Sequence, residues 1–130
     1  YNFRNIYGRV YTDKVSMKTL DEIRLTPSQR QALSELQQQL YGSFGIQAIS
    51  LFGSFARGEA DQESDIALLI ITKRPLKRTV RHQITEIVFE VNLKYDTNFS
   101  TLVIDRLSWE EGLISVLPLR DEILKEGIPL

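Results

Sequence analysis

Residues Phe52 to Ile71 read FGSFARGEADQESDIALLII, and the interpretation of the whole chain depends on this stretch. A glycine-serine turn at Gly53 and Ser54 is followed by a polar loop, and then by Asp65 directly before six apolar residues. An apolar run this short, rich in isoleucine and leucine, is typical of a strand buried on both faces of a sheet. We therefore expect Asp65 at the start of a central strand, one short loop away from Gly53.

Side chains alternate along a strand, so residues 65 and 67 are expected to point to the same side. An acid at both positions would form a pair of oxygen ligands facing the glycine turn. Two-metal phosphoryl-transfer sites need such carboxylates, which bridge ions roughly 3.5–4 Å apart. This chain has Asp65 at the first position and Ala67 at the second. Taken alone, the Gly-Ser pair is more typical of a tight turn with a capping serine, and Asp65 is as typical of a loop cap as of a ligand.

The segments before the stretch predict a helix and a strand. Thr26 is placed to cap a helix over Pro27–Tyr41, because proline suits the first helical position and Gln29 completes a capping box. Gly42 is expected to end this helix. Residues 46–52 then read as a strand that runs into the glycine turn.

The segments after the stretch continue the same mixed pattern. Apolar residues at spacings of three and four predict a long helix over about 76–95, with Glu90 and Lys94 at pairing distance on its solvated side. A strand is expected over 99–104, a short helix capped by Ser108 after it, and a last helix from Pro118 to Gly127. The order predicts an α/β (α+β) fold, a small mixed sheet of three or more strands flanked by helices.

The length of 130 residues fits one domain. Met17 begins the natural start MKTLDEI, so we interpret residues 1–16 as an upstream or tag-derived extension and residues 17–130 as the domain. The chain lacks cysteine and has one histidine, His82, so a metal here would be held by carboxylates, which favours Mg²⁺ or Mn²⁺ over Zn²⁺. Of these two ions we expect Mg²⁺. No apolar stretch reaches the length of a membrane span, and we expect a cytoplasmic location without membrane association.

The stretch GSFARGEADQESDIALLI resembles the signature of minimal nucleotidyltransferases of the DNA polymerase β superfamily: Gly-Ser, a short spacer, then Asp-x-Asp and an apolar strand. The ending PLRDEILKEGIPL resembles their closing helix, so the resemblance covers residues 17–130. It implies a palm-like fold and Mg²⁺-dependent transfer of a nucleotidyl group, AMP being expected, from ATP to a hydroxyl on a partner protein.

The resemblance also implies roles for individual residues. Gly53 and Ser54 would hold the triphosphate, and Asp65 would be a metal ligand and catalytic residue. Arg57, in the spacer, is within reach of a phosphate, although a solvated surface arginine is an equally good interpretation. Many such proteins are antitoxins encoded beside a helical HEPN-type partner.

Two departures from the family pattern bear on activity. Ala67 replaces the second acid, and the position of the third acid falls near Ser100 in FSTLVID, while Asp105 lies at the far end of that strand. Loss of a bridging ligand should cost more than the roughly 10–100-fold typical of outer-shell changes. We therefore predict impaired transfer, by natural change or by engineering. The alternatives are a catalytically silent antitoxin-like protein that neutralises a HEPN-type toxin by binding, and a nucleotide sensor without transfer.

The net charge of −1 gives no overall reason to expect nucleic acid. Positive charge concentrates in one basic cluster, which we define as Lys73, Arg74, Lys77, Arg78, Arg81 and His82. The cluster is a candidate surface for an acidic acceptor, for RNA or for a partner protein, and a solvated face is the commoner explanation. Phe99 and Trp109 are expected in the core rather than stacked on a nucleotide.

Overall fold

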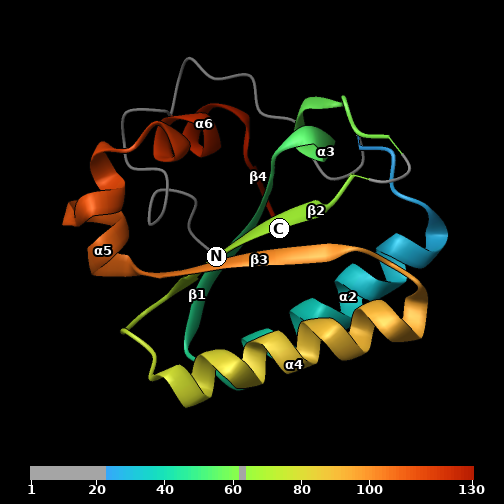
Figure 1. Ribbon diagram of the computed structural model, residues 1–130, viewed down its shortest axis with the longest axis horizontal. Helices are drawn as coiled ribbons and strands as arrows, with labels where there is room; N and C mark the ends of the chain where they lie inside the picture. The colour runs from blue at the N-terminus through green and yellow to red at the C-terminus, as the bar shows by residue number, and fades with distance from the viewer. Residues whose placement is uncertain (1–22, 62–63) are drawn as a thin grey trace.

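The sheet has four strands in the order β3-β2-β1-β4 (Figure 1). They are β1 (Ile46–Phe52), β2 (Ile66–Thr72), β3 (Phe99–Asp105) and β4 (Ile128–Pro129). Strand β1 is antiparallel to β2 and to β4, whereas β2 and β3 are parallel. This computed structural model describes residues 23–61 and 64–130, so the predicted boundary at Met17 lies outside the described residues. The predicted α/β class with a mixed sheet is confirmed.

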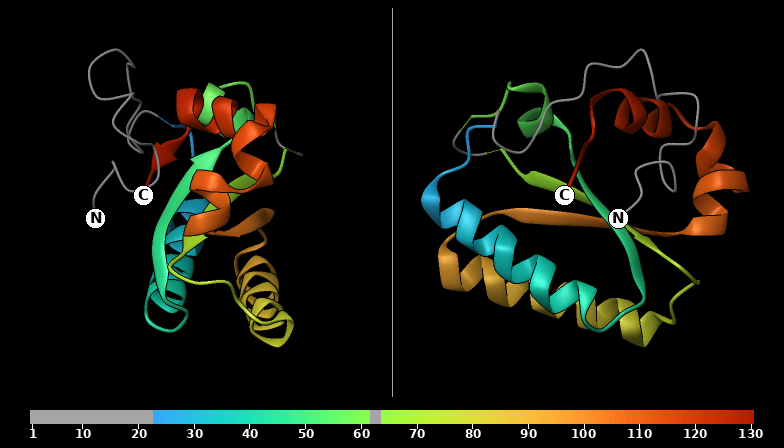
Figure 2. Two further views of the ribbon diagram at one scale, coloured as in Figure 1. Left: turned by 90° about the vertical axis from the view of Figure 1, so that its left-hand side faces the viewer. Right: turned by 180° about the vertical axis from the view of Figure 1, so that it is seen from behind.

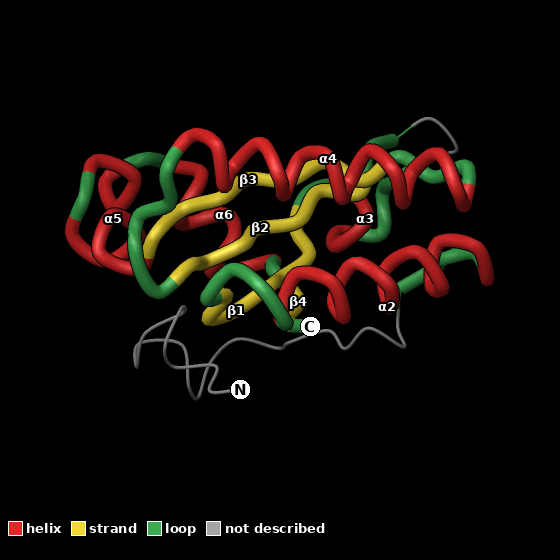
Figure 3. The backbone as a smooth tube through the Cα atoms, turned by 90° about the horizontal axis from the view of Figure 1, so that it is seen from below, coloured by secondary structure: helices red, strands yellow, loops and turns green. Residues whose placement is uncertain are grey.

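Helices α2 (Pro27–Tyr41) and α4 (Arg78–Tyr95) cover one face of the sheet and run beside each other in Figure 3. The predicted capping box is present: the Gln29 N–H donates to Thr26 Oγ1 at 3.1 Å, and the Thr26 N–H donates to Gln29 Oε1 at 2.8 Å. These two bonds satisfy backbone groups that the first turn of a helix leaves without partners. Pro27 stands at the start of the helix and Gly42 at its end, as predicted.

The opposite face carries α5 (Arg106–Glu111), the 3₁₀ turn η3 (Leu113–Val116) and α6 (Pro118–Glu126), which lie on the other side of the sheet from α2 and α4 in both views of Figure 2. A short helix, α3 (Ser54–Arg57), follows β1. No helix among the described residues is long and apolar enough to cross a membrane.

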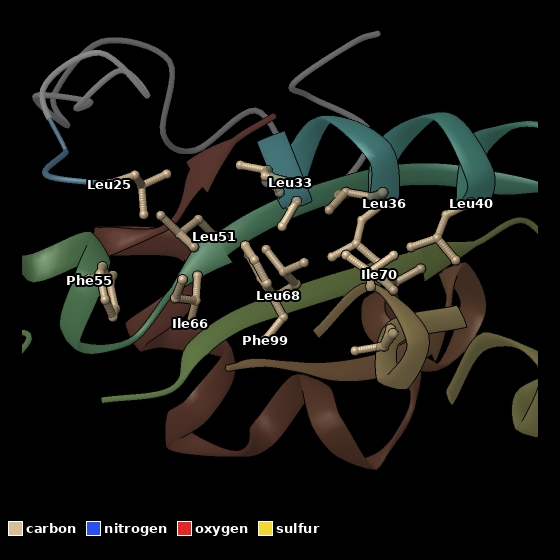
Figure 4. Close-up of a cluster of buried hydrophobic side chains, with 14 of the residues drawn as sticks. Leu25, Leu33, Leu36, Leu40, Leu51, Phe55, Ile66, Leu68, Ile70 and Phe99 are labelled. Carbon is tan, nitrogen blue, oxygen red and sulfur yellow. The ribbon is translucent and has the colours of Figure 1, made fainter. Parts of the chain in front are cut away.

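The main hydrophobic core lies between the sheet and the pair α2 and α4. Figure 4 shows leucines of α2 pointing at alternate residues of β2. Its fully buried members include Leu33, Leu36, Leu40, Ile49, Leu51, Ile66, Leu68, Ile70 and Ile84. Phe99 is also buried in this core, as predicted. Burial of apolar surface on this scale is the principal stabilising term of the fold.

A second core cluster lies on the other face, beneath α5 and α6. Leu69 and Ile71 of β2 and Trp109 of α5 are fully buried there. Strand β2 is therefore buried on both faces, which confirms the interpretation of its apolar run. Ala67 is the exception, since it is only partly buried. The second face is thus fully covered at Leu69 and Ile71 and only partly covered at Ala67.

Three local expectations need correction. Helix α4 begins at Arg78 rather than at Leu76, because Leu76 packs on the core from the preceding loop. Ser108 does not cap α5: the side chain of Asp105 is the cap and accepts from the Ser108 N–H at 3.0 Å. Lys94 pairs with Glu35 of α2 at 2.7 Å, not with Glu90, since the two helices pack side by side.

The outer edge of β3 is bonded to side chains of α4. Asn92 donates from Nδ2 to the Phe99 carbonyl at 3.0 Å, and the Phe99 N–H donates to Asn92 Oδ1 at 2.9 Å. Further along the strand, Arg81 Nη1 donates to the Val103 carbonyl at 3.1 Å. These bonds satisfy backbone groups of β3 that do not pair with β2.

Candidate functional site

The turn after β1 is formed by two glycines with positive φ. Gly53 has φ 81° and ψ −155°, and Gly58 has φ 75°. The first combination is essentially restricted to glycine, because a Cβ would clash with the backbone. Between them, residues Ser54 to Arg57 make the single helical turn α3. The chain therefore reverses sharply at the end of β1 and exposes backbone at Gly53.

Ala67 lies directly in front of this turn. It pairs with Phe52 of β1 on one side and with Ser100 of β3 on the other. A Cβ built on Gly53 would lie 3.6 Å from the Ala67 Cβ, which is van der Waals distance. The position of the second acid thus faces the glycine turn, and Ser100 occupies the position expected for the third acid.

Asp65 is exposed, just ahead of β2, and its carboxylate is bonded to one neighbour. Asn98 donates from its side-chain amide to Asp65 Oδ1, and its backbone carbonyl accepts from the Ile66 N–H at 2.9 Å. Asn98 therefore holds both the side chain of Asp65 and the first residue of the strand. Among the residues that the structure describes, no hydrogen bond engages the second carboxylate oxygen, Oδ2.

Arg57 carries the positive charge of this segment and is bound by two carboxylates. Its Nε lies 3.0 Å from Glu59 Oε2, and its Nη1 lies 3.3 Å from Glu126 Oε2. The hydrogen bond to Glu59, followed by the one to Glu126, raises the pKa of Arg57 above its usual value. Arg57 is therefore a permanent cation at the rim of the turn, and its present partners are protein side chains.

The polar loop between α3 and β2 is closed on itself at its end. The Asp61 N–H donates to Ser64 Oγ at 3.0 Å, and the Ser64 hydroxyl lies 3.0 Å from Asp61 Oδ1. Asp61 is thereby engaged within the loop. The loop is followed directly by Asp65, which lies beside Asn98.

Asp105 lies at the opposite end of β3, opposite Thr72, as the sequence predicted. The hydroxyl and backbone N–H of Ser108 donate to its carboxylate at 2.7 and 3.0 Å, and these bonds lower the pKa of Asp105. Asp105 is thus an ionised helix cap, far from the glycine turn.

The basic cluster also lies away from the glycine turn. It follows the end of β2, whereas Asp65 precedes its beginning, and seven residues of strand span roughly 23 Å. All six of its side chains are exposed, and none forms an ion pair with the described part of the chain. A small molecule bound at Gly53 therefore cannot reach the cluster.

The donor set at the glycine turn does not fit a two-ion metal site. Of the three positions at which the family pattern places acids, only Asp65 is a carboxylate, beside a methyl group at residue 67 and a hydroxyl at Ser100. Within residues 23–61 and 64–130, no group of three or more histidine, cysteine, aspartate or glutamate side chains is arranged to hold a metal ion. Two bridging ions need several carboxylates, so this arrangement lacks the required ligands.

Two residues of this region were missed by sequence reasoning. Asn98 lies outside the sequence motif, and only the parallel pairing of β2 with β3 brings it to Asp65. Glu126 lies 69 residues after Arg57, and no spacing in the sequence could connect them. A side-chain amide one residue before a predicted strand was the only available signal for the first, and there was none for the second.

Known proteins resemble this chain in sequence. It is 40% identical over 77 residues to MJ1305, a candidate protein adenylyltransferase of Methanocaldococcus jannaschii, covering 56% of this chain and 52% of that protein. It is 36% identical over 56 residues to the protein adenylyltransferase MntA of Thermococcus cleftensis, covering 43% of this chain and 50% of that protein. The chain thus spans about half the length of the curated relatives that it matches.

Two solved structures have the same fold. One is a crystal structure of a toxin–antitoxin with AMP-PNP, with a TM-score of 0.51 at 17% identity over 80% of this chain and 72% of that chain. The other is a point mutant of the toxin–antitoxin MntA-HpeT, with a TM-score of 0.50 at 18% identity over 82% of this chain and 72% of that chain. At this identity the likeness concerns the fold alone.

The sequence pattern of one family covers most of the chain. The nucleotidyltransferase domain matches residues 29–128, which include strands β1 to β3, the glycine turn, Asp65 and helix α6. The matched region and the mixed sheet agree on one assignment: this chain belongs to the nucleotidyltransferase domain family.

Proposed function

We propose that this chain binds a nucleoside triphosphate, ATP, at the Gly53–Ser54 turn, and that its competent form transfers AMP to a hydroxyl on a partner protein. We further propose that Ala67 impairs this transfer. The observation that carries the proposal is the position of Ala67, whose Cβ would lie 3.6 Å from a Cβ built on Gly53 and which is paired with Ser100. The family membership and the relatives named protein adenylyltransferase support the same class of reaction.

The roles follow from the local geometry. Gly53 leaves the backbone of the turn open to phosphate oxygens, and the hydroxyl of Ser54 is a further donor next to it. Asp65 supplies the one carboxylate of the site, and Asn98 fixes the direction of that carboxylate. Such a site would act mainly by positioning the triphosphate and the acceptor.

The proposed transfer exchanges one phosphorus–oxygen bond for another. The acceptor oxygen forms a bond to the α-phosphorus of ATP, the bond from that phosphorus to the bridging oxygen breaks, and pyrophosphate leaves. The hydroxyl proton passes to a base, for which Asp65 is the candidate because it is the one carboxylate among the three acid positions. With a methyl group at residue 67, no second carboxylate is available to share the charge of the reaction.

The absence of acids at residues 67 and 100 also favours a second function. A chain that has lost its second and third acids can still bind another protein, and the two structural neighbours come from toxin–antitoxin complexes. In this alternative the chain is a catalytically silent antitoxin that neutralises a HEPN-type toxin by contact. A nucleotide sensor without transfer is the third candidate.

The test compares this chain with Ala67→Asp and with the matched control Ala67→Asn, which has the same shape without the charge. The measurements are ATP affinity by calorimetry and transfer of label from α-labelled ATP to the protein encoded by the neighbouring gene, each with and without Mg²⁺. We expect Ala67→Asp to raise the transfer rate by more than about 10-fold and Ala67→Asn to leave it unchanged.

The outcomes separate the three candidates. If Ala67→Asp binds ATP and transfers label, the chain is an impaired enzyme. If neither protein binds ATP but this chain binds the neighbouring protein tightly, the silent antitoxin is supported and the nucleotide site is refuted. If ATP binds and Ala67→Asp transfers nothing to any acceptor offered, the sensor is favoured.

A further inference from the structure

Arg57 is the one positively charged side chain that the segment around the proposed nucleotide site contributes. It is the only lysine or arginine between residues 46 and 72, a range that includes β1, α3, the polar loop and β2. The loop after it contains four acids in seven residues: Glu59, Asp61, Glu63 and Asp65. The segment that contains the glycine turn thus carries one positive and four negative side chains, so a triphosphate bound there has one cation of this segment to pair with. The availability of Arg57 should decide how well it binds.

Arg57 is already engaged by carboxylates from two elements. Glu59 belongs to the loop, whereas Glu126 is the last residue of α6 and comes from a distant part of the chain. In Figure 1, α3 and α6 lie on the same side of the sheet. An acid in the last turn of a helix opposes the helix dipole, and the Arg57 guanidinium offsets this cost for Glu126.

The contact between Arg57 and Glu126 is weak enough to exchange. The two side chains are 36% and 39% exposed, and their closest atoms are 3.3 Å apart. Exposed ion pairs contribute little to stability, because water and salt screen them. A guanidinium can instead form two parallel hydrogen bonds to a phosphate, which is among the stronger polar contacts available to it.

We infer that Glu126 is a built-in competitor of the nucleotide: it holds Arg57 at rest, and the triphosphate must take Arg57 from it. Glu126 thereby sets the nucleotide affinity of the chain without touching the nucleotide. Glu59, which is adjacent in the loop and 67% exposed, is the second resting partner. This inference rests on the proposed function, since it needs ATP at the glycine turn.

The test is the ATP affinity of Glu126→Gln, measured by calorimetry at low ionic strength with full-length protein. The substitution keeps the shape of the side chain and removes the charge that competes for Arg57. We expect ATP to bind about two- to five-fold more tightly, the range that an exposed ion pair allows. Glu122→Gln is the matched control, because Glu122 is an exposed glutamate of the same helix outside the ion pairs of the described chain.

A double-mutant cycle assigns the effect to Arg57. Arg57→Gln should weaken ATP binding, and Glu126→Gln should have no further effect in that background. In the native background, the increase in ATP affinity caused by Glu126→Gln should become smaller as salt is added. The inference is overturned if Glu126→Gln equals Glu122→Gln, if it binds ATP more weakly than the native chain, or if its gain persists without Arg57.

A different result would refute the proposed function itself rather than the competition for Arg57. If the native chain and all variants keep their circular dichroism spectrum and none of them binds ATP, the nucleotide site itself is refuted. ATP binding that is insensitive to Glu126 would instead retain the site and reject only the competition for Arg57.

Discussion

Ala67 of β2 lies directly opposite Ser100 of β3, so the two positions at which the family pattern places acids are neighbours across the sheet. They carry a methyl group and a hydroxyl, and Asp65 stands two residues before the first of them. Without those two carboxylates, positions 67 and 100 carry no charge that a cation could neutralise.

This pairing predicts how restored acids would behave. The double variant Ala67→Asp with Ser100→Asp places like charges opposite each other, which destabilises a sheet. We expect its melting temperature to fall in EDTA and to recover when Mg²⁺ or Mn²⁺ is added, because a ligand of the native state stabilises it. The variant with asparagine at both positions should not respond to the ions. A double aspartate variant that melts at the same temperature in EDTA and in Mg²⁺ would contradict the prediction.

Gly53 should tolerate no side chain. Gly53→Ala must place a Cβ on a backbone with φ 81° and ψ −155°, at a cost of about 1–3 kcal/mol in the free energy of unfolding. The matched control is Gly42→Ala at the end of α2, where φ is −78° and the backbone is right-handed helical. Urea unfolding of both variants measures the difference. Equal stabilities would mean that the turn does not require glycine.

The contact between Glu35 and Lys94 predicts a pH dependence of stability. Hydrogen bonds from Lys94 and then from Tyr95 lower the pKa of Glu35 below its usual value of 4.5. A carboxyl with a lowered pKa in the folded state contributes stability that is complete above its unfolded pKa and is lost as the pH falls through its folded pKa. The melting temperature of the native chain should therefore fall more than that of Glu35→Gln between about pH 6 and about pH 3. Parallel curves for the two proteins would rule out this contribution.

The core beneath β2 predicts a large effect of a single truncation. Leu36→Ala removes a fully buried side chain between α2 and the sheet, and the loss should be about 2–5 kcal/mol in the free energy of unfolding. Leu107→Ala is the control, since that side chain is 63% exposed, and its stability should change by less than about 0.5 kcal/mol. Chemical denaturation distinguishes the two, and similar losses would refute the assignment of the core.

Much of the fold could be predicted because its signals are local. Thr26, Pro27 and Gln29 define the start of α2 within four residues, and an unbroken apolar run defines β2. Strand β4 was missed because it is two residues long and contains a proline, and it exists only through its pairing with β1. Such a strand has no pattern of its own in the sequence.

The candidate site likewise contains residues that the sequence predicts and residues that only the fold brings there. The turn at Gly53 and the position of Asp65 follow from a contiguous motif, and the sheet register brought Ser100 to the place where the third acid was expected. Glu126 and Asn98 reach the site from elsewhere in the chain, so only the folded structure brings them there. Contacts between distant segments depend on tertiary packing, which spacing in the sequence does not record.

The side chains of α4 along β3 affect how this protein meets other copies of itself. A strand at the border of a sheet can recruit a strand from another molecule through its unpaired backbone groups, which leads to aggregation. Here both backbone groups of Phe99 are engaged by Asn92, and the Val103 carbonyl is engaged by Arg81. An incoming strand would have to displace these side chains before it could add to the sheet. Helix α4 therefore protects the border of β3 against self-association in addition to its role in the core.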